Sequence, residues 1–156
     1  MSVPKESVPE GVIFVGLQAA GKSTFYVERF FNSHVRVSLD LLRTRQRERV
    51  FLDACLRTRQ PFVVDNTNPT VAERARYLEP VLGAGFRAVG YFFVPDVAAS
   101  IRRYETRAGR WRVPRVGIYG TRKRLEAPSY AEGFDRLFEV TITPEGEFVV
   151  AEVARE

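Results

Sequence analysis

The chain has 156 residues, of which 45% are hydrophobic, and a formal net charge of +5. This length allows one well-buried core but no second domain of typical size, so we expect a single domain over residues 1–156, with a flexible start at 1–9. No apolar stretch approaches the roughly 20 residues that span a bilayer, and residues 1–10 contain no apolar signal-peptide segment. These features predict a cytoplasmic protein without membrane contact, and the single cysteine excludes a disulfide within the chain.

Apolar runs alternate with segments of helical spacing along the chain. Strand-like runs occur at 12–15, 35–38, 62–65, 89–94 and 137–143, and 147–153 is a marginal addition. Helical spacing occurs at 22–31, 47–59, 70–82 and 96–108, and again in a stretch that ends near Pro128. Strands that alternate with helices indicate an α/β fold, with a parallel sheet and right-handed crossovers.

A Walker A motif follows the first expected strand directly. It reads Gly16-Leu17-Gln18-Ala19-Ala20-Gly21-Lys22-Ser23-Thr24. Its glycines allow backbone N–H groups to surround a β-phosphate, and the helix that follows offers its positive N-terminus. Lys22 is positioned to reach the β- and γ-phosphate oxygens, and the Ser23 hydroxyl is a ligand for Mg²⁺. The motif therefore predicts binding of a nucleoside triphosphate, either ATP or GTP, with Mg²⁺.

Two carboxylates stand where the second and third expected strands end. Asp40 follows the second strand, and Asp65 ends the third, so both belong at the sheet edge where open α/β sheets bind ligands. Asp40 suits the general base that accepts the proton of an attacking hydroxyl, with Arg43 on an acceptor phosphate, although a helix N-cap would use the same position. Asp65 suits support of Mg²⁺, and the alternative is that residues 66–69 form only a turn.

Basic residues gather between 102 and 124, where nine arginines and lysines are opposed only by Glu105. Such a segment favours an anionic partner, either a triphosphate or a nucleic acid, although a solvated helix face would have a similar pattern. Arg103 and Arg107 lie one helical turn apart, just before an irregular arginine-rich stretch. We therefore expect an arginine-rich lid in which these two residues close on the γ-phosphate.

These residues together resemble the 5′-kinase domain of the polynucleotide kinase family, which belongs to the P-loop kinases. The resemblance covers residues 11–143, and its most specific parts are 119–128 and Glu132-Gly133-Phe134. It implies a three-layer P-loop NTPase fold with strand order 2-3-1-4-5. It also implies a catalytic Asp40, acceptor-phosphate binding by Arg43 and lid arginines at Arg103 and Arg107. The Asp-x-Asp-x-Thr phosphatase motif that accompanies many such kinases does not occur in this sequence.

The predicted activity is transfer of a γ-phosphate to a hydroxyl, with the 5′-OH end of DNA or RNA as the first candidate acceptor. A P-loop kinase of a small hydroxylated metabolite would use the same loop, base and lid. A nucleotide-binding switch protein without transferase activity would need only the loop. The sequence favours transfer over a switch because Asp40 and the paired arginines serve the reaction and not binding alone. It leaves the oligomeric state open.

Overall fold

A six-stranded sheet forms the centre of the computed structural model, which describes residues 8–106 and 115–155. Its strands are β1 (Glu10–Val15), β2 (Val35–Val37), β3 (Phe62–Val64), β4 (Arg87–Phe93), β5 (Arg136–Ile142) and β6 (Phe148–Glu152). The order is β2-β3-β1-β4-β5-β6, in which the first five strands are parallel and β6 runs antiparallel to β5. The predicted order of the five parallel strands is confirmed, and the marginal run at 147–153 is the antiparallel edge strand.

The helices lie close to the predicted segments. They are α1 (Lys22–Arg29), α2 (Leu39–Leu42), α3 (Arg45–Thr58), α4 (Val71–Gly83), α5 (Val97–Thr106) and α6 (Arg115–Arg124), with a 3₁₀ turn, η3 (Tyr130–Glu132). α4 begins where the capping sequence indicates, because the Thr70 side chain accepts a hydrogen bond from the Glu73 N–H at 3.1 Å. The sequence did not predict α2 and η3, which are single turns too short to show helical periodicity.

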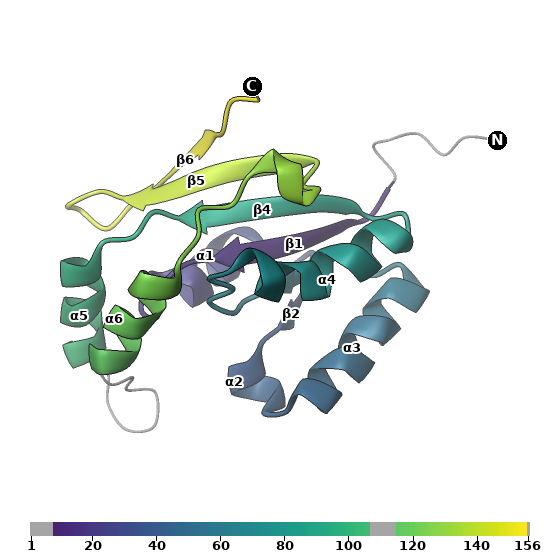
Figure 1. Ribbon diagram of the computed structural model, residues 1–156, viewed down its shortest axis with the longest axis horizontal. Helices are drawn as coiled ribbons and strands as arrows, with labels where there is room; N and C mark the ends of the chain where they lie inside the picture. Colours follow the sequence, from purple (N-terminus) through teal and green to yellow (C-terminus); the bar gives the residue numbers. More distant parts are fainter. Residues whose placement is uncertain (1–7, 107–114, 156) are drawn as a thin grey trace.

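The sheet is covered on both faces, which explains why its strands read as continuous apolar runs. Along β1, Ile13 and Val15 pack into the cluster under α3 and α4, whereas Val12 and Phe14 pack into the cluster under α1. Figure 1 shows α3 and α4 in front of the sheet and α1 behind it. The three-layer α/β fold is therefore confirmed.

The carboxyl ends of the parallel strands meet at one edge of the sheet, and α5 and α6 lie side by side beyond that edge (Figure 1). The loops that follow β1, β2 and β3 all open there, so motifs far apart in the sequence are brought together. Within residues 8–106 and 115–155, no helix is long and apolar enough to cross a membrane.

Candidate active site

The Walker A loop is held in shape by the backbone of the sheet. Gly16 lies so close to β4 that a Cβ atom there would come within 2.8 Å of Phe93 Cβ, and its N–H donates to the Thr67 carbonyl at 3.0 Å. Gly21 precedes α1 with φ of 92°, a left-handed conformation that favours glycine. Both glycines are therefore required by geometry, one for close packing and the other for the turn into the helix.

Lys22 is folded into the loop that precedes it. Its ammonium donates to the carbonyl oxygens of Gly16 at 3.2 Å and Leu17 at 2.5 Å, and the residue is 8% exposed. These contacts hold a positive charge inside the loop, beside the N-terminus of α1, where a phosphate group would also be stabilised by backbone N–H groups.

Ser23, Asp65 and Arg36 form a polar cluster beside the loop. The Ser23 hydroxyl donates to Asp65 Oδ2 at 2.9 Å, and the same oxygen accepts from Arg36 Nε at 2.8 Å. A second Arg36 nitrogen lies 3.0 Å from Ser23 Oγ. Because the Asp65 side chain is only 2% exposed, Arg36 supplies the charge that balances this buried carboxylate. The sequence analysis gave Ser23 and Asp65 roles in binding Mg²⁺, and it missed Arg36.

The oxygen donors of this cluster fit Mg²⁺, which prefers hard oxygen ligands and keeps several positions for water and phosphate oxygens. Ser23 Oγ and Asp65 Oδ2 are within hydrogen-bond distance and both residues border the same cleft. In the part of the chain that the structure describes, no three His, Cys, Asp or Glu side chains gather as a metal cage. The donor set suits a metal that is shared with a bound triphosphate.

Asp40 and the phosphate loop line one cleft of about 350 Å³. Its walls come from the Walker A loop, from the start of α2 and from the residues after β3. They comprise Gln18, Ala19, Ala20, Gly21, Lys22, Ser23, Leu39, Asp40, Asp65, Asn66 and Thr67. Asp40 lies in the first turn of α2, whose N-cap is Ser38, so the alternative role of Asp40 as an N-cap is wrong.

Arg43 ends α2 outside the walls of this cleft. It is exposed and has φ of 76° and ψ of −39°, a backbone conformation that a non-glycine residue rarely adopts. Residues with such rare φ and ψ angles are held in place by the contacts around them, and they occur more often at ligand sites. Arg43 follows α2 directly, three residues after Asp40, and its role in binding an acceptor phosphate stays a prediction.

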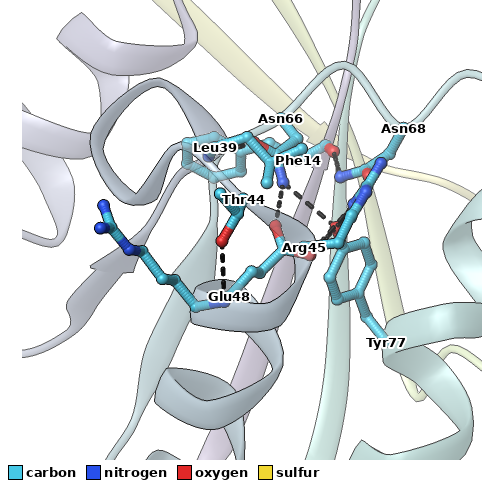
Figure 2. Close-up of polar contacts among 9 residues, drawn as sticks. Phe14, Leu39, Thr44, Arg45, Glu48, Asn66, Asn68 and Tyr77 are labelled. Atoms are coloured by element: carbon cyan, nitrogen blue, oxygen red, sulfur yellow. Dashed lines mark hydrogen bonds and ion pairs between the residues drawn. The ribbon is translucent and has the colours of Figure 1, made fainter.

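A buried polar network fixes the backbone next to Asp40. The Asn66 side chain accepts a hydrogen bond from the Leu39 N–H at 3.0 Å and donates to Glu48 Oε2 at 3.0 Å and the Tyr77 hydroxyl at 3.2 Å. Tyr77 donates in turn to Glu48 Oε1 at 2.9 Å, and Arg45 donates to both of these residues. Figure 2 shows these side chains converging from α3, α4 and the loop after β3. Asn66 therefore ties α2 to the two covering helices.

Tyr77 remains a neutral hydrogen-bond donor in this network. Burial raises the pKa of its hydroxyl, and the nearby Glu48 carboxylate raises it further. Glu48 is itself only 2% exposed and accepts from Arg45, Tyr77 and Asn66, so its charge is well compensated. A fully satisfied network of this kind holds its members in one arrangement.

The helices on either side of residues 107–114 contact the phosphate loop. Arg103, from α5, donates to the Ala19 carbonyl at 3.1 Å, and Gln18 donates to Thr121 of α6 at 2.8 Å. A second hollow of about 570 Å³, bordered by Gly21 and Thr24, contains Arg103 in its wall. Arg107 lies outside the described residues.

Glu132, in the last part of the segment that carries the resemblance, stabilises the fold. Arg74 of α4 is fully buried and forms two hydrogen bonds with the Glu132 carboxylate, at 2.7 and 3.0 Å. It also donates to the Asn68 carbonyl at 3.0 Å, and the Asn68 side chain donates to the Phe14 carbonyl at 2.8 Å. These contacts connect η3 and α4 to the strand that precedes the Walker A loop.

The sequence matches a known protein family. The sequence profile of a family described as an AAA domain matches residues 12–128, which is most of the chain. The chain belongs to this family. Its fold and its Walker A loop are those of a P-loop kinase domain, and the resemblance noted from the sequence is confirmed.

The chain is similar to two curated proteins. It is 25% identical over 141 residues to the "Bifunctional polynucleotide phosphatase/kinase" of Schizosaccharomyces pombe, covering 87% of this chain and 34% of that protein. It is 27% identical over 142 residues to a "Putative bifunctional polynucleotide phosphatase/kinase" of Acanthamoeba polyphaga mimivirus, covering 85% and 33%. The chain therefore spans about a third of the length of the curated relatives it matches.

Solved structures share the fold at low sequence identity. A gluconokinase from Sinorhizobium meliloti has a TM-score of 0.59 at 19% identity, covering 86% of this chain and 83% of that chain. A chain of the Pnkp1/Rnl/Hen1 RNA repair complex has a TM-score of 0.63 at 21% identity, covering 79% and 47%. Proteins with quite different names thus share this architecture, and at these identities the likeness shows the fold alone.

Proposed function

We propose that the chain is a polynucleotide 5′-hydroxyl kinase-like enzyme, which transfers the γ-phosphate of ATP, with GTP as the alternative donor, to the 5′-OH end of DNA or RNA. The observation that carries this proposal is the shared cleft: Asp40 and the Walker A loop line the same space of about 350 Å³. A general base and a triphosphate site in one cleft serve transfer to an acceptor.

On the donor side, the backbone N–H groups of the loop surround the β-phosphate. Lys22 exchanges the carbonyl oxygens of Gly16 and Leu17, which it contacts at 3.2 and 2.5 Å, for the β- and γ-phosphate oxygens. Arg103 and Arg107 close on the γ-phosphate from the lid. Ser23 and Asp65 would hold a magnesium ion, which would neutralise charge on the phosphate oxygens.

On the acceptor side, Asp40 orients the 5′-hydroxyl and accepts its proton. The acceptor oxygen forms a bond to the γ-phosphorus as the bond from that phosphorus to the β–γ bridging oxygen breaks, and ADP leaves with the electron pair. Arg43, three residues after Asp40, holds the phosphate of the acceptor next to the reacting end. Asn66 positions Asp40 through the Leu39 N–H.

Two observations favour a nucleic-acid acceptor over a small metabolite. Both curated relatives carry a polynucleotide kinase name, and the basic segment at 102–124 matches a polyanion. The fold shared with a gluconokinase makes a small hydroxylated metabolite the second candidate acceptor.

The test is transfer of labelled γ-phosphate from ATP and Mg²⁺ to 5′-OH oligonucleotides of DNA and RNA, beside a panel of hydroxylated metabolites. We expect label on the oligonucleotide 5′ end, with activity that falls steeply as salt rises because phosphate contacts release counterions. Label on a metabolite alone would overturn the acceptor and keep the reaction. Tight ATP binding without transfer to any acceptor would instead indicate a switch protein.

A further inference from the structure

We infer that a groove between α3 and α4 is a second acceptor subsite, which takes a nucleotide unit of the acceptor strand inside its 5′ end. The inference rests on the proposed function. The groove has a volume of about 430 Å³, comparable to that of the phosphate cleft, and it shares no lining residue with that cleft. The transfer of the γ-phosphate itself does not require this groove.

The walls of the groove combine an apolar floor with a cationic rim. Leu52 and Leu56 of α3 and Pro80 of α4 supply apolar surface, and Arg45, Arg49 and Arg76 supply guanidinium groups. A nucleotide has the same two parts, since its base offers a flat apolar face and its phosphate offers charge. Arginine is well suited to both because its planar fork binds phosphate oxygens and stacks on aromatic rings.

The charges of the groove leave two arginines available for an anion. The two carboxylates in the wall are already paired: Glu48 accepts from Arg45 at 3.0 Å, and Asp53 lies 3.0 Å from Arg57. Arg49 and Arg76 are exposed and form no hydrogen bond or ion pair with any described residue. Across the groove from each other, these two guanidinium groups favour a negatively charged occupant.

The groove lies next to the phosphate cleft, because Asn66 of the cleft wall contacts Glu48 and Tyr77 of the groove wall. Arg43, directly after α2, is followed by the α3 N-cap Thr44 and then by Arg45 in the groove wall. The Cα atoms of the two arginines are therefore about 7 Å apart at most. Inside the protein, Asn66 contacts the Leu39 N–H on the cleft side and Glu48 and Tyr77 on the groove side. Figure 2 shows Asn66 between these two sets of partners. A strand whose end lies at Asp40 therefore enters the groove after Arg43.

The test uses acceptors of increasing length that all present a 5′-OH: a nucleoside 3′-monophosphate, a dinucleotide and a hexanucleotide, plus hexanucleotides with one abasic position. In the wild-type protein, kcat/KM rises with length and falls when an internal base that reaches the groove is removed. In Arg49→Ala/Arg76→Ala, the ratio of kcat/KM for the hexanucleotide to that for the monophosphate falls on the order of ten-fold. The salt slope for the hexanucleotide decreases by about 1 for each arginine removed.

Arg47→Ala is the matched control, because Arg47 is an exposed arginine of the same helix that does not line the groove. It should leave the length ratio unchanged. The subsite is overturned if kcat/KM does not rise with acceptor length. It is also overturned if the hexanucleotide-to-monophosphate ratio of kcat/KM falls no further in the double variant than in Arg47→Ala. Both of those results leave the 5′-kinase assignment intact, whereas a wild-type protein that labels no oligonucleotide overturns the kinase assignment and the subsite together.

Discussion

The two sides of the phosphate cleft are built in different ways. The donor side is one continuous segment, residues 16–24, in which backbone N–H groups and Lys22 are placed by the turn between β1 and α1. The acceptor side is assembled from α2, the loop after β3 and the covering helices α3 and α4, joined through Asn66, Glu48 and Tyr77. Changes on the donor side should therefore act on nucleotide binding, and changes in the distant network should act on the acceptor.

The largest expected effect is at Lys22. Lys22→Ala removes the positive charge that would meet the β- and γ-phosphates, so kcat/KM should fall by at least about a hundred-fold and ATP affinity should fall with it. Activity assays and calorimetric titration with ATP measure the two effects. Arg47→Ala, at an exposed arginine of α3 that lines neither the cleft nor the groove, is the control for loss of one charge. A Lys22→Ala protein with wild-type ATP affinity and activity would show that the loop does not bind the donor.

A smaller effect, confined to the acceptor side, is expected from Tyr77→Phe. The change removes one hydroxyl that bonds with Glu48, Arg45 and Asn66, so the free energy of unfolding should fall by about 1–2 kcal/mol. Because Asn66 then holds Leu39 less firmly, kcat/KM for the acceptor should fall several-fold while KM for ATP stays unchanged. Tyr119→Phe, at an exposed tyrosine of α6, controls for the substitution itself. If Tyr77→Phe changed KM for ATP as much as kcat/KM for the acceptor, the acceptor side would not be separate from the donor side.

The smallest effect is expected far from the cleft, at Glu10. A hydrogen bond with His34 lowers the pKa of this carboxyl, and a hydrogen bond from Arg87 adds to the effect. A lowered pKa in the folded state stabilises the protein above the ordinary carboxyl pKa, and this contribution is lost as the pH falls through the lower folded value. Glu10→Gln should therefore lower the free energy of unfolding by about 1 kcal/mol or less at pH 7.

The pH dependence of that difference is the control for the Glu10 prediction. The gap between wild-type and Glu10→Gln unfolding free energies should shrink as the pH falls below about 4, because the wild-type carboxyl then becomes neutral as well. Thermal unfolding at pH 7 and pH 3 measures it, with kinase assays as a second readout. A difference of the same size at both pH values would show that the charge of Glu10 is not the cause. A loss of kinase activity in Glu10→Gln would show that Glu10 affects the cleft as well as stability.

The donor side could be predicted from the sequence because its information is local. The Walker A motif specifies a strand, a turn and a helix in consecutive residues, and the glycines at 16 and 21 are explained by one close contact and one positive φ. The same holds for the sheet order, since alternating strands and helices allow few arrangements. Asp40 and Asp65 were placed correctly at the cleft because the carboxyl ends of parallel strands share one edge.

The network behind Asp40 could not be predicted, because its members meet only in the folded chain. Glu48 and Asn66 are 18 residues apart, and Glu48 and Tyr77 are 29 apart, without a motif that links them. Asn66 was expected only in a turn, and no role was expected for Arg36. A charged residue inside a three-residue apolar strand was the one available signal for Arg36. Glu132 shows the reverse. It belongs to a motif that carried the resemblance, yet it stabilises the fold and does not line the cleft.

The most direct test of the account is phosphoryl transfer by Asp40→Asn, measured together with ATP binding. This variant keeps the size of the side chain and the contacts of α2, but it no longer accepts the proton of the attacking 5′-hydroxyl. We expect ATP affinity close to that of the wild type and a kcat for a 5′-OH oligonucleotide at least about a hundred-fold lower. Transfer to the oligonucleotide at the wild-type rate would contradict the account, because the acceptor would then react without Asp40.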